Sequence, residues 1–343
     1  MPASRKTQEF VEKELPYKIL IYLYENSRAP LKKLGREFNI SYHTVAEVLR
    51  KYEEKYGVTY TLELDETKLG FSAGVIITVK FSKMPDVEML RARLQKDIYV
   101  QNAYLGSGDF DLIMYLVGLN AHEFGVWQYK WRIDFGEYKP TIFSVNLIHF
   151  NMGFFPLRSE LIAESNILSE SEKKVLLLLN ENSRMKLKEI VKRSRLSQMR
   201  VIYIIKKLTK MGIIKGYRAL VQQPDKKLVV AYSGTFTYIK EHSRILLNYL
   251  KEMVKEDFHE QVNDYSIMYD TSGFCDIFWM CAFTDGIAAA KRGPEILYEL
   301  WKEENPKITK TVLTSLLVGK WPFHLETYKQ QIKDIKNIES GSY

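Results

Sequence analysis

Six outward-facing residues of one predicted helix include side chains with which proteins contact bases and phosphates. The helix spans about Gln198–Met211 and follows Ser197, a residue type that caps helix starts. Its buried face is marked by apolar residues at helical spacing, namely Val201, Ile204, Ile205 and Leu208. The opposite face presents Gln198, Met199, Arg200, Tyr203, Lys206 and Lys207. Arg and Gln can each form two hydrogen bonds to a base edge, and Lys can contact phosphates, so we expect this helix to bind double-stranded DNA.

A second helix with the same plan is predicted between Ser41 and Gly57. Ser41 caps it, and Gly57 ends it. Its outward residues are Tyr42, His43, Glu47, Arg50 and Lys51. Glu can accept a hydrogen bond from cytosine, while the basic pair at the end suits phosphates. For any single residue in either set, the alternative is an ordinary solvent-exposed helix face.

Both helices belong to a duplicated segment. Leu23–Lys51 matches Leu179–Lys207 at a constant offset of 156 residues, with ten identities in 29 positions and no gap. The motif Glu-Asn-Ser-Arg occurs in both copies, at Glu25–Arg28 and Glu181–Arg184. A fixed long-range self-match of this kind indicates a repeated structural unit.

The flanking residues predict that each copy is a winged helix-turn-helix. The expected earlier helices are one ending near Asn26 and Leu31–Phe38 in the first copy, and Glu172–Asn182 and Leu187–Ser194 in the second. The expected wing strands are Val58–Leu64 and Ile213–Val221. In this arrangement the third helix of each copy enters the major groove, and the wing and the basic helix end grip phosphates.

The positive charge of the chain is concentrated in the second copy. The whole chain carries a net charge of +8. Leu168–Arg218 contains fourteen Lys or Arg and four Glu, which is +10, whereas Met1–Tyr60 contains eleven basic and eight acidic residues, which is +3. A localised basic field is typical of a surface that binds a polyanion, although it can also be a solvated basic surface. We therefore expect the second copy to supply most of the affinity for DNA.

The remaining composition excludes several other classes of protein. The 343 residues suffice for two to four small domains, and no apolar run approaches the roughly 18 residues of a membrane span. Two cysteines, Cys275 and Cys281, do not form a disulfide framework and are expected to be packed thiols. The six histidines lack ligand spacing, and there is no phosphate-binding glycine loop. We therefore expect a cytoplasmic protein without a cofactor or a metal.

The region after each helix-turn-helix predicts the order strand, helix, strand, strand, helix, strand. In the first region we expect strands at Ala73–Phe81, Tyr99–Gly106, Phe110–Leu119 and Thr141–Asn151, with helices at Asp86–Lys96 and Ala121–Phe135. In the second we expect strands at Val229–Ile239, Glu260–Tyr269, Cys275–Phe283 and Ile308–Val318, with helices at His242–Lys255 and Gly286–Glu303. That order is the ferredoxin-like βαββαβ plan.

Together these motifs resemble the Lrp/AsnC family of transcription regulators. The resemblance rests on the Glu-Asn-Ser-Arg helix end and on a Ser-Gly-x-x-Asp turn in each βαββαβ region, at Ser107–Asp111 and Ser272–Asp276. It implies an α+β fold in which βαββαβ domains pair their sheets and sense small molecules, often amino acids. Family members usually carry one unit per chain and dimerise, whereas here two unequal units are fused. The expected domains are 1–66, 67–158, 167–224 and 225–325, and we expect an archaeal source.

The resemblance also implies an effector site beside the two turns, where the sheets meet. By position it involves Gly106, Ser107, Gly108, Asp109, Asp111, Ser272, Gly273 and Asp276. The alternative is that these residues form ordinary β-turns in which Gly supplies a positive φ.

We expect, in sum, a sequence-specific DNA-binding transcription regulator with two non-identical recognition helices and no enzymatic activity. Its expected partners are double-stranded DNA, a small-molecule effector such as an amino acid, a second copy of the chain and the basal transcription machinery, with no membrane. Two alternatives stay open. One is an enzyme similar to the sirohaem decarboxylases, which resemble this family and pair two such units. The other is a nonspecific architectural DNA-binding protein.

Overall fold

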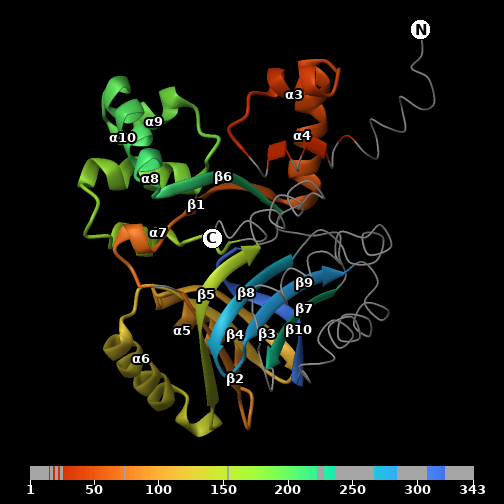
Figure 1. Ribbon diagram of the computed structural model, residues 1–343, viewed down its shortest axis with the longest axis vertical. Coiled ribbons are helices and arrows are strands. Elements are labelled where there is room, and N and C mark those ends of the chain that lie inside the picture. Colours follow the sequence, from red (N-terminus) through yellow and green to blue (C-terminus); the bar gives the residue numbers. More distant parts are fainter. Residues whose placement is uncertain are drawn as a thin grey trace, which may run out of the picture. The chain divides into compact units, whose positions relative to one another are not determined.

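The structure of the chain is a computed structural model with a mixed α+β fold (Figure 1). It describes residues 15, 18, 19, 22, 23, 26–72, 74–152, 154–221, 228–235, 266–283 and 307–320. Most of the predicted first helix of the first copy, and both predicted helices of the second βαββαβ region, lie outside these residues. None of the described helices is long and apolar enough to cross a membrane.

The chain folds into two compact units, each assembled from two stretches of sequence. The winged unit contains the described residues up to 69 and those from 162 to 221. The barrel unit contains the described residues from 70 to 161 and from 228 to 320. The first and third predicted domains therefore share one unit, and the second and fourth share the other.

The winged unit contains two sets of helices, each followed by a strand. The first set is α3 (Leu31–Glu37), α4 (Tyr42–Tyr56) and β1 (Val58–Leu64). The second set is α8 (Glu170–Glu181), α9 (Leu187–Ser194), α10 (Gln198–Lys210) and β6 (Ile214–Val221). A short 3₁₀ helix, η2 (Thr67–Leu69), follows β1, and a short helix, α7 (Ser159–Ala163), precedes α8.

Serine caps start the two third helices where the sequence predicts. The Ser41 side chain accepts a hydrogen bond from Thr44 N at 3.0 Å, and the Ser197 side chain accepts one from Arg200 N at 3.3 Å. Each cap satisfies a backbone N–H that the helix leaves unpaired, which is typically worth about 1 kcal/mol. Apolar residues one turn apart, such as Val201, then bury the inner face of the helix.

The two predicted wing strands form as β1 and β6. β1 and β6 pair with each other as an antiparallel ribbon, from Val58 opposite Val221 to Leu64 opposite Ile214, and they run side by side in Figure 1. The predicted strands are therefore confirmed, and the structure adds that they pair with each other. A single strand leaves its backbone groups unpaired, and here the strand of the other copy satisfies them.

The barrel unit is a closed eight-stranded barrel with the strand order β10-β3-β4-β2-β5-β8-β9-β7. The strands of its first half are β2 (Val75–Lys80), β3 (Val100–Gly108), β4 (Leu112–Leu116) and β5 (Thr141–Met152). Those of its second half are β7 (Leu228–Thr235), β8 (Ser266–Gly273), β9 (Ile277–Phe283) and β10 (Lys307–Val318). The halves join at two seams, β3 with β10 and β5 with β8.

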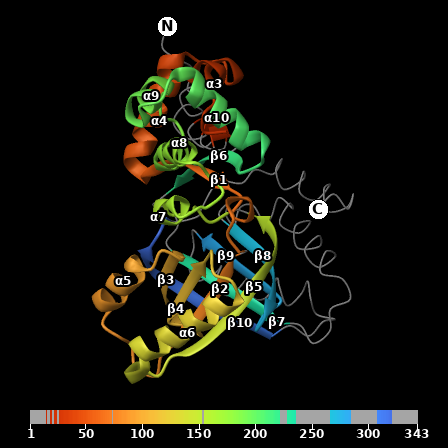
Figure 2. The same cartoon turned by 90° about the vertical axis from the view of Figure 1, so that its left-hand side faces the viewer.

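Two helices cover one face of the first half-barrel, in the predicted βαββαβ order. They are α5 (Val87–Lys96) and α6 (Ala121–Asp134), followed by the short 3₁₀ helix η3 (Gly136–Tyr138). Figure 2 shows both helices against the strands. Trp131 of α6 is fully buried in the core with Leu94 of α5 and Met114 of β4. Truncation of such a residue typically costs about 3–5 kcal/mol, so this core fixes the helices on the sheet.

A glycine lies at the end of one strand in each seam. Gly108 has a φ of +135°, and a Cβ there would collide with the carbonyl oxygen of Lys310 on β10. Gly273 has a φ of +142°, and a Cβ there would collide with the carbonyl oxygen of Ser144 on β5. L-residues rarely adopt this φ, so both the backbone conformation and the close approach require glycine.

We predict that Gly108→Ala and Gly273→Ala each lower the free energy of unfolding by about 2 kcal/mol or more, because strain and a backbone collision act together. Chemical denaturation followed by circular dichroism measures this. Gly125→Ala is the matched control, because no atom lies within 4 Å of its Cβ position in α6. It should be neutral or stabilising by up to about 1 kcal/mol. Equal effects at all three sites would contradict the seam argument.

Candidate nucleic-acid interface

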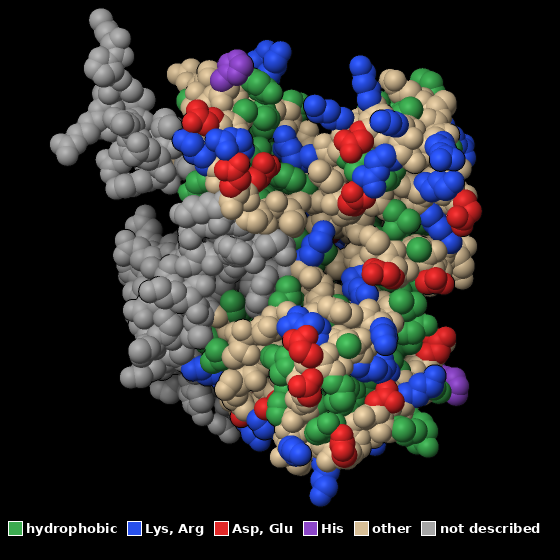
Figure 3. All heavy atoms as spheres, turned by 180° about the vertical axis from the view of Figure 1, so that it is seen from behind, with side chains coloured by type: hydrophobic (Ala, Val, Ile, Leu, Met, Phe, Trp, Pro, Cys, Tyr) green, Lys and Arg blue, Asp and Glu red, His purple; other side chains and the backbone are tan. Residues whose placement is uncertain are grey.

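The outer face of α10 presents the predicted reading residues to solvent. All but one of them are exposed: Gln198, Met199, Arg200, Tyr203 and Lys206. Met199 is 77% exposed and Tyr203 is 56% exposed, which is unusual for apolar side chains on a packed helix. On the face of the molecule that Figure 3 shows, many Lys and Arg side chains lie over the helices of the winged unit, with Asp and Glu side chains among them. The arrangement suits contact with a polyanion.

Arg200 and Tyr203 form a pair on this face. The guanidinium carbon of Arg200 lies 5.5 Å from the centre of the Tyr203 ring, which is a cation–π contact worth about 0.5–1 kcal/mol at an exposed site. An arginine that is already stacked loses less conformational freedom when it binds a base edge. The pair is therefore suited to recognising a base.

Lys207, the remaining predicted residue of α10, has a different environment. Its Nζ lies 2.7 Å from Oε1 of Glu172 in α8, and that carboxylate also accepts hydrogen bonds from N and Oγ of Ser169. Burial raises the pKa of Glu172, but the hydrogen bonds from Lys207 and Ser169 outweigh burial and lower the pKa to about 2. Lys207 thus fastens α10 to α8, and its contact with phosphate stays a prediction.

The outer face of α4 carries the other predicted set. Tyr42, His43, Glu47, Arg50 and Lys51 are all exposed. Tyr42 and His43 make an edge-to-face contact with ring centres 5.4 Å apart. The remaining residues are engaged in pairs along the helix: Lys51 with Glu47 at 2.9 Å, and Arg50 with Glu54 at 2.7 Å.

The repeated Glu-Asn-Ser-Arg motif joins the two copies. The hydroxyls of Ser27 and Ser183 are hydrogen-bonded to each other at 2.6 Å, and both residues are fully buried. The Ser27 N–H donates to the carbonyl of Tyr217 on β6, and the Ser183 N–H donates to the carbonyl of Tyr60 on β1. Each copy therefore binds the strand of the other. We call this contact the serine joint.

The arginines of the motif cross the serine joint in the same way. Arg28 donates from Nη1 to the Ser183 carbonyl at 3.0 Å, and Arg184 donates from Nη1 to the Ser27 carbonyl at 2.5 Å. Arg28 also lies 5.4 Å from the Tyr217 ring centre, and Arg184 lies 5.2 Å from that of Tyr60. Asparagine shapes each turn, because its side chain accepts the N–H of the arginine two residues later.

The predicted site residues do not include the serines and arginines of this motif. One signal was present: the motif is identical in the two copies, whereas the outward faces of the two third helices differ. A contact around an approximate two-fold axis requires the same residues twice, since each side must offer what the other accepts.

The predicted effector residues lie at the two barrel seams. Ser107 pairs with Val312, and Ser272 pairs with Asn146. Two backbone hydrogen bonds close the turns, from Gly106 N to the Asp111 carbonyl and from Thr271 N to the Asp276 carbonyl.

The carboxylates of the first turn have partners within the barrel unit. Asp109 accepts from Lys310 N at 2.6 Å. Asp111 accepts from Phe81 N at 2.8 Å and pairs with Lys80 at 2.7 Å. These contacts hold the seam together, and an effector role for the turn residues stays a prediction.

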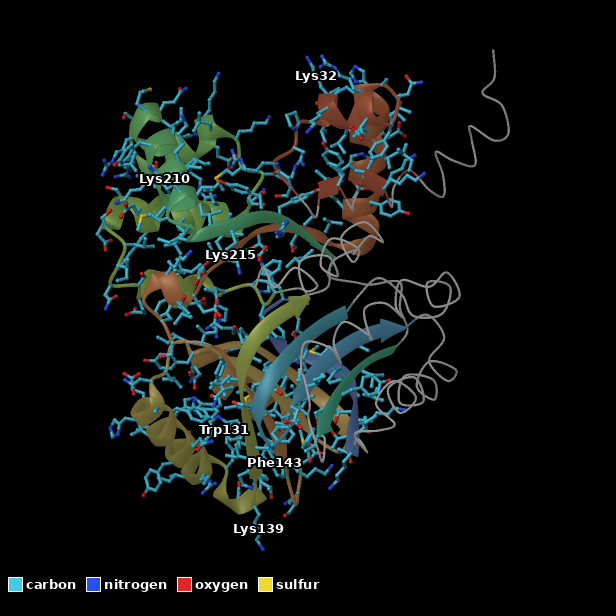
Figure 4. The ribbon with its side chains drawn as sticks, in the orientation of Figure 1. Lys32, Trp131, Lys139, Phe143, Lys210 and Lys215 are labelled. Atoms are coloured by element: carbon cyan, nitrogen blue, oxygen red, sulfur yellow. The ribbon has the colours of Figure 1, made fainter. Side chains whose placement is uncertain are left out.

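Three aromatic rings cluster beside the turns. The rings of Phe110, Phe143 and Phe274 lie with centres 5.4–5.8 Å apart, and Figure 4 labels Phe143 on β5. Phe110 and Phe274 each lie within a Ser-Gly-x-x-Asp turn, so the two turns pack against each other. The cysteine prediction agrees at Cys275, which is buried, and burial raises the pKa of its thiol to about 12.

Comparison with known proteins places the second copy among DNA-binding modules. A family profile described as winged helix-turn-helix DNA-binding matches residues 168–215. The HTH-type transcriptional regulator LrpA of Bacillus subtilis is 31% identical over 97 residues, which are 28% of this chain and 71% of LrpA. The chain belongs to the Lrp/AsnC family.

A second relative comes from an archaeon. An uncharacterised HTH-type transcriptional regulator of Pyrococcus furiosus is 25% identical over 136 residues, which are 39% of this chain and 82% of that protein. The archaeal source of the present chain stays a prediction.

A solved structure resembles the whole chain. The crystal structure of the sirohaem decarboxylase NirDL has a TM-score of 0.56 with 14% identity, and the match covers 96% of this chain and 100% of NirDL. At this identity the likeness shows the fold. It also corrects the expectation that this protein has no enzymatic activity, because an enzyme shares this fold. That expectation relied on the absence of familiar catalytic motifs, which does not exclude catalysis.

If the serine joint holds the two copies together, its arginines should contribute more to the free energy of unfolding than an arginine in an exposed ion pair. Arg28→Ala and Arg184→Ala should each lower the free energy of unfolding of the winged unit by about 1–3 kcal/mol, because a hydrogen bond from a charged donor to a buried carbonyl is lost. The control is Arg193→Ala, which breaks an exposed ion pair with Glu181. It should cost less than about 1 kcal/mol. Urea denaturation compares the three variants, and equal losses would contradict the joint.

Glu172 predicts a specific dependence of stability on pH. Its pKa in the folded protein is about 2, below the ordinary 4.5, so its stabilising effect is full above pH 4.5 and is lost as the pH falls towards 2. Glu172→Gln should therefore be less stable than the wild type at pH 6, by about 1–3 kcal/mol. The difference should shrink as the pH falls from 4.5 to 2 in thermal denaturation. A difference independent of pH would contradict the assignment.

Proposed function

We propose that this protein is a sequence-specific transcription regulator that binds double-stranded DNA through two non-identical recognition helices, α4 and α10. The observation that carries the proposal is the outer face of α10, where exposed Arg200, Tyr203 and Met199 lie on a helix with no acidic residue. The helix belongs to the segment that matches a DNA-binding family profile, and LrpA is named a transcriptional regulator.

We further propose that one chain supplies both helix-turn-helix segments that bind a DNA site, whereas relatives with one such segment per chain need two chains. Within the winged unit, the two helix-turn-helix copies contact each other through the serine joint and the β1–β6 ribbon. Within the barrel unit, the two half-barrels join at the two seams. A rigid joint between the two helix-turn-helix copies holds their recognition helices at one spacing. The DNA site then has two unequal halves, because the outward residues of α4 and α10 differ.

The decisive experiment selects bound duplexes from a random pool and then titrates one selected duplex by fluorescence anisotropy. Arg200→Ala combined with Tyr203→Ala should weaken binding by at least tenfold and relax the preference at one half-site, since a good bidentate contact contributes about 1–3 kcal/mol of discrimination. Lys139→Ala, in the barrel unit after η3, is the control and should bind like the wild type. Unchanged affinity and preference in the double variant would overturn the role of α10.

A second function is favoured by the whole-chain likeness to NirDL. In that case the barrel unit would bind an anionic tetrapyrrole and catalyse loss of carboxylate groups from it. Addition of sirohaem to the protein tests this directly. A saturable shift of the Soret absorbance and release of carbon dioxide would support the enzyme. A spectrum equal to that of free sirohaem, together with salt-sensitive binding of duplex DNA, would support the regulator alone.

A further inference from the structure

The two recognition helices differ sharply in charge. α10 carries Arg200, Lys206, Lys207 and Lys210 and has no acidic residue, so its side chains sum to +4. α4 carries Arg50, Lys51 and Lys55 but also Glu47, Glu53 and Glu54, so its side chains sum to zero. The difference does not come from fewer basic residues alone. It comes mostly from acidic residues that α4 has gained.

Two of these acidic residues occupy positions that matter in the other copy. At the offset of 156 residues, Glu47 corresponds to Tyr203 and Glu54 corresponds to Lys210. Arg50 and Lys51 correspond to the basic pair Lys206 and Lys207. The basic pair is thus kept in both copies, and in α4 a glutamate stands one turn away from each member.

The geometry couples each glutamate to one basic group. Glu47 Oε1 lies 2.9 Å from Lys51 Nζ, and Glu54 Oε1 lies 2.7 Å from Arg50 Nη1. All four side chains are 60–63% exposed, so they share the solvent face of the helix. The hydrogen bond from Lys51 lowers the pKa of Glu47, so this carboxylate stays charged at neutral pH.

The strength of these pairs decides how they act. An exposed pair one helical turn apart stabilises by only about 0.3–0.5 kcal/mol, so a phosphate could displace the glutamate from Lys51 or Arg50. The displaced carboxylate would still lie within a few ångströms of a strand that carries a negative charge at every phosphate. The glutamates therefore act through charge and not by locking the basic side chains.

We propose that Glu47 and Glu54 are specificity-determining residues that suppress the sequence-independent attraction of α4 to phosphate. This inference rests on the proposed function. It assigns the sequence-independent part of binding to α10 and leaves α4 to discriminate through Tyr42 and His43. The protein then binds DNA in one orientation. The half-site under α10 supplies most of the affinity, and the half-site under α4 contributes mainly discrimination between sequences.

A rival role for Glu47 makes the opposite prediction. Glutamate can accept a hydrogen bond from the amino group of cytosine, as the sequence alone suggests. If Glu47 reads cytosine, its removal weakens binding to the selected duplex and relaxes one base position. If it repels phosphate, its removal strengthens binding to any duplex.

The test is Glu47→Gln combined with Glu54→Gln in the full chain, with binding measured from 50 to 200 mM salt. On a duplex of random sequence, affinity at 50 mM salt should rise roughly tenfold, and the slope of log affinity against log salt should steepen by about 2, since each additional phosphate contact contributes about 0.9. Preference for the selected duplex over the random one should fall.

The matched control makes the same charge change elsewhere. Glu88→Gln combined with Glu137→Gln removes two exposed carboxylates from the barrel unit. This variant should leave the slope unchanged, which separates a local effect from a change in net charge. Circular dichroism of both variants should match the wild type, because only exposed carboxylates are replaced.

The outcomes separate this inference from the function on which it rests. A wild type without salt-sensitive DNA binding overturns both. A wild type that binds, with a Glu47→Gln, Glu54→Gln variant of unchanged slope, overturns the inference alone. Loss of affinity for the selected duplex in Glu47→Gln alone assigns that residue to base reading and overturns its role as a repelling charge.

Discussion

The hydrogen bond between Ser27 and Ser183 is the contact around which the winged unit is organised. It lies on the approximate two-fold axis that relates the copies, where a residue meets its own equivalent. A hydroxyl suits this position because it can both donate and accept, so two identical side chains can satisfy each other. On either side of this hydrogen bond, Arg28 and Arg184 each donate to the serine carbonyl of the other copy, and β1 pairs with β6.

In the barrel unit, the two halves likewise satisfy each other, here through backbone hydrogen bonds between strands. Each half is a four-stranded sheet with two open edges, and an open edge exposes unpaired N–H and C=O groups. The second strand of each half pairs with the last strand of the other, which removes the edges at both seams. Gly108 and Gly273 permit the close approach that this pairing needs. Neither half of this unit is therefore a finished domain without the other.

This mutual dependence explains why one architecture is compatible with both a regulator and an enzyme. Because both helix-turn-helix segments lie in one chain, the outward residues of one can differ from those of the other while the contact between them is kept. In the winged unit the change is in charge, with α10 at +4 and α4 at zero. In the barrel unit the seams hold Phe110, Phe143 and Phe274 where a symmetric pair would present the same residues twice, since the position equivalent to Phe143 is Thr309.

The sequence by itself determined the local elements and the family. Periodic apolar residues and serine caps located α4, α9 and α10 almost to the residue, because helix starts and buried faces depend on neighbours within a few positions. Exposure of the predicted reading residues followed from the same periodicity. Only the tertiary structure decided what the repeated motif does, how the wing strands pair and which partner Lys207 takes. Those outcomes depend on residues about 35 to 160 positions apart, and no local pattern encodes which of two identical copies a side chain will contact.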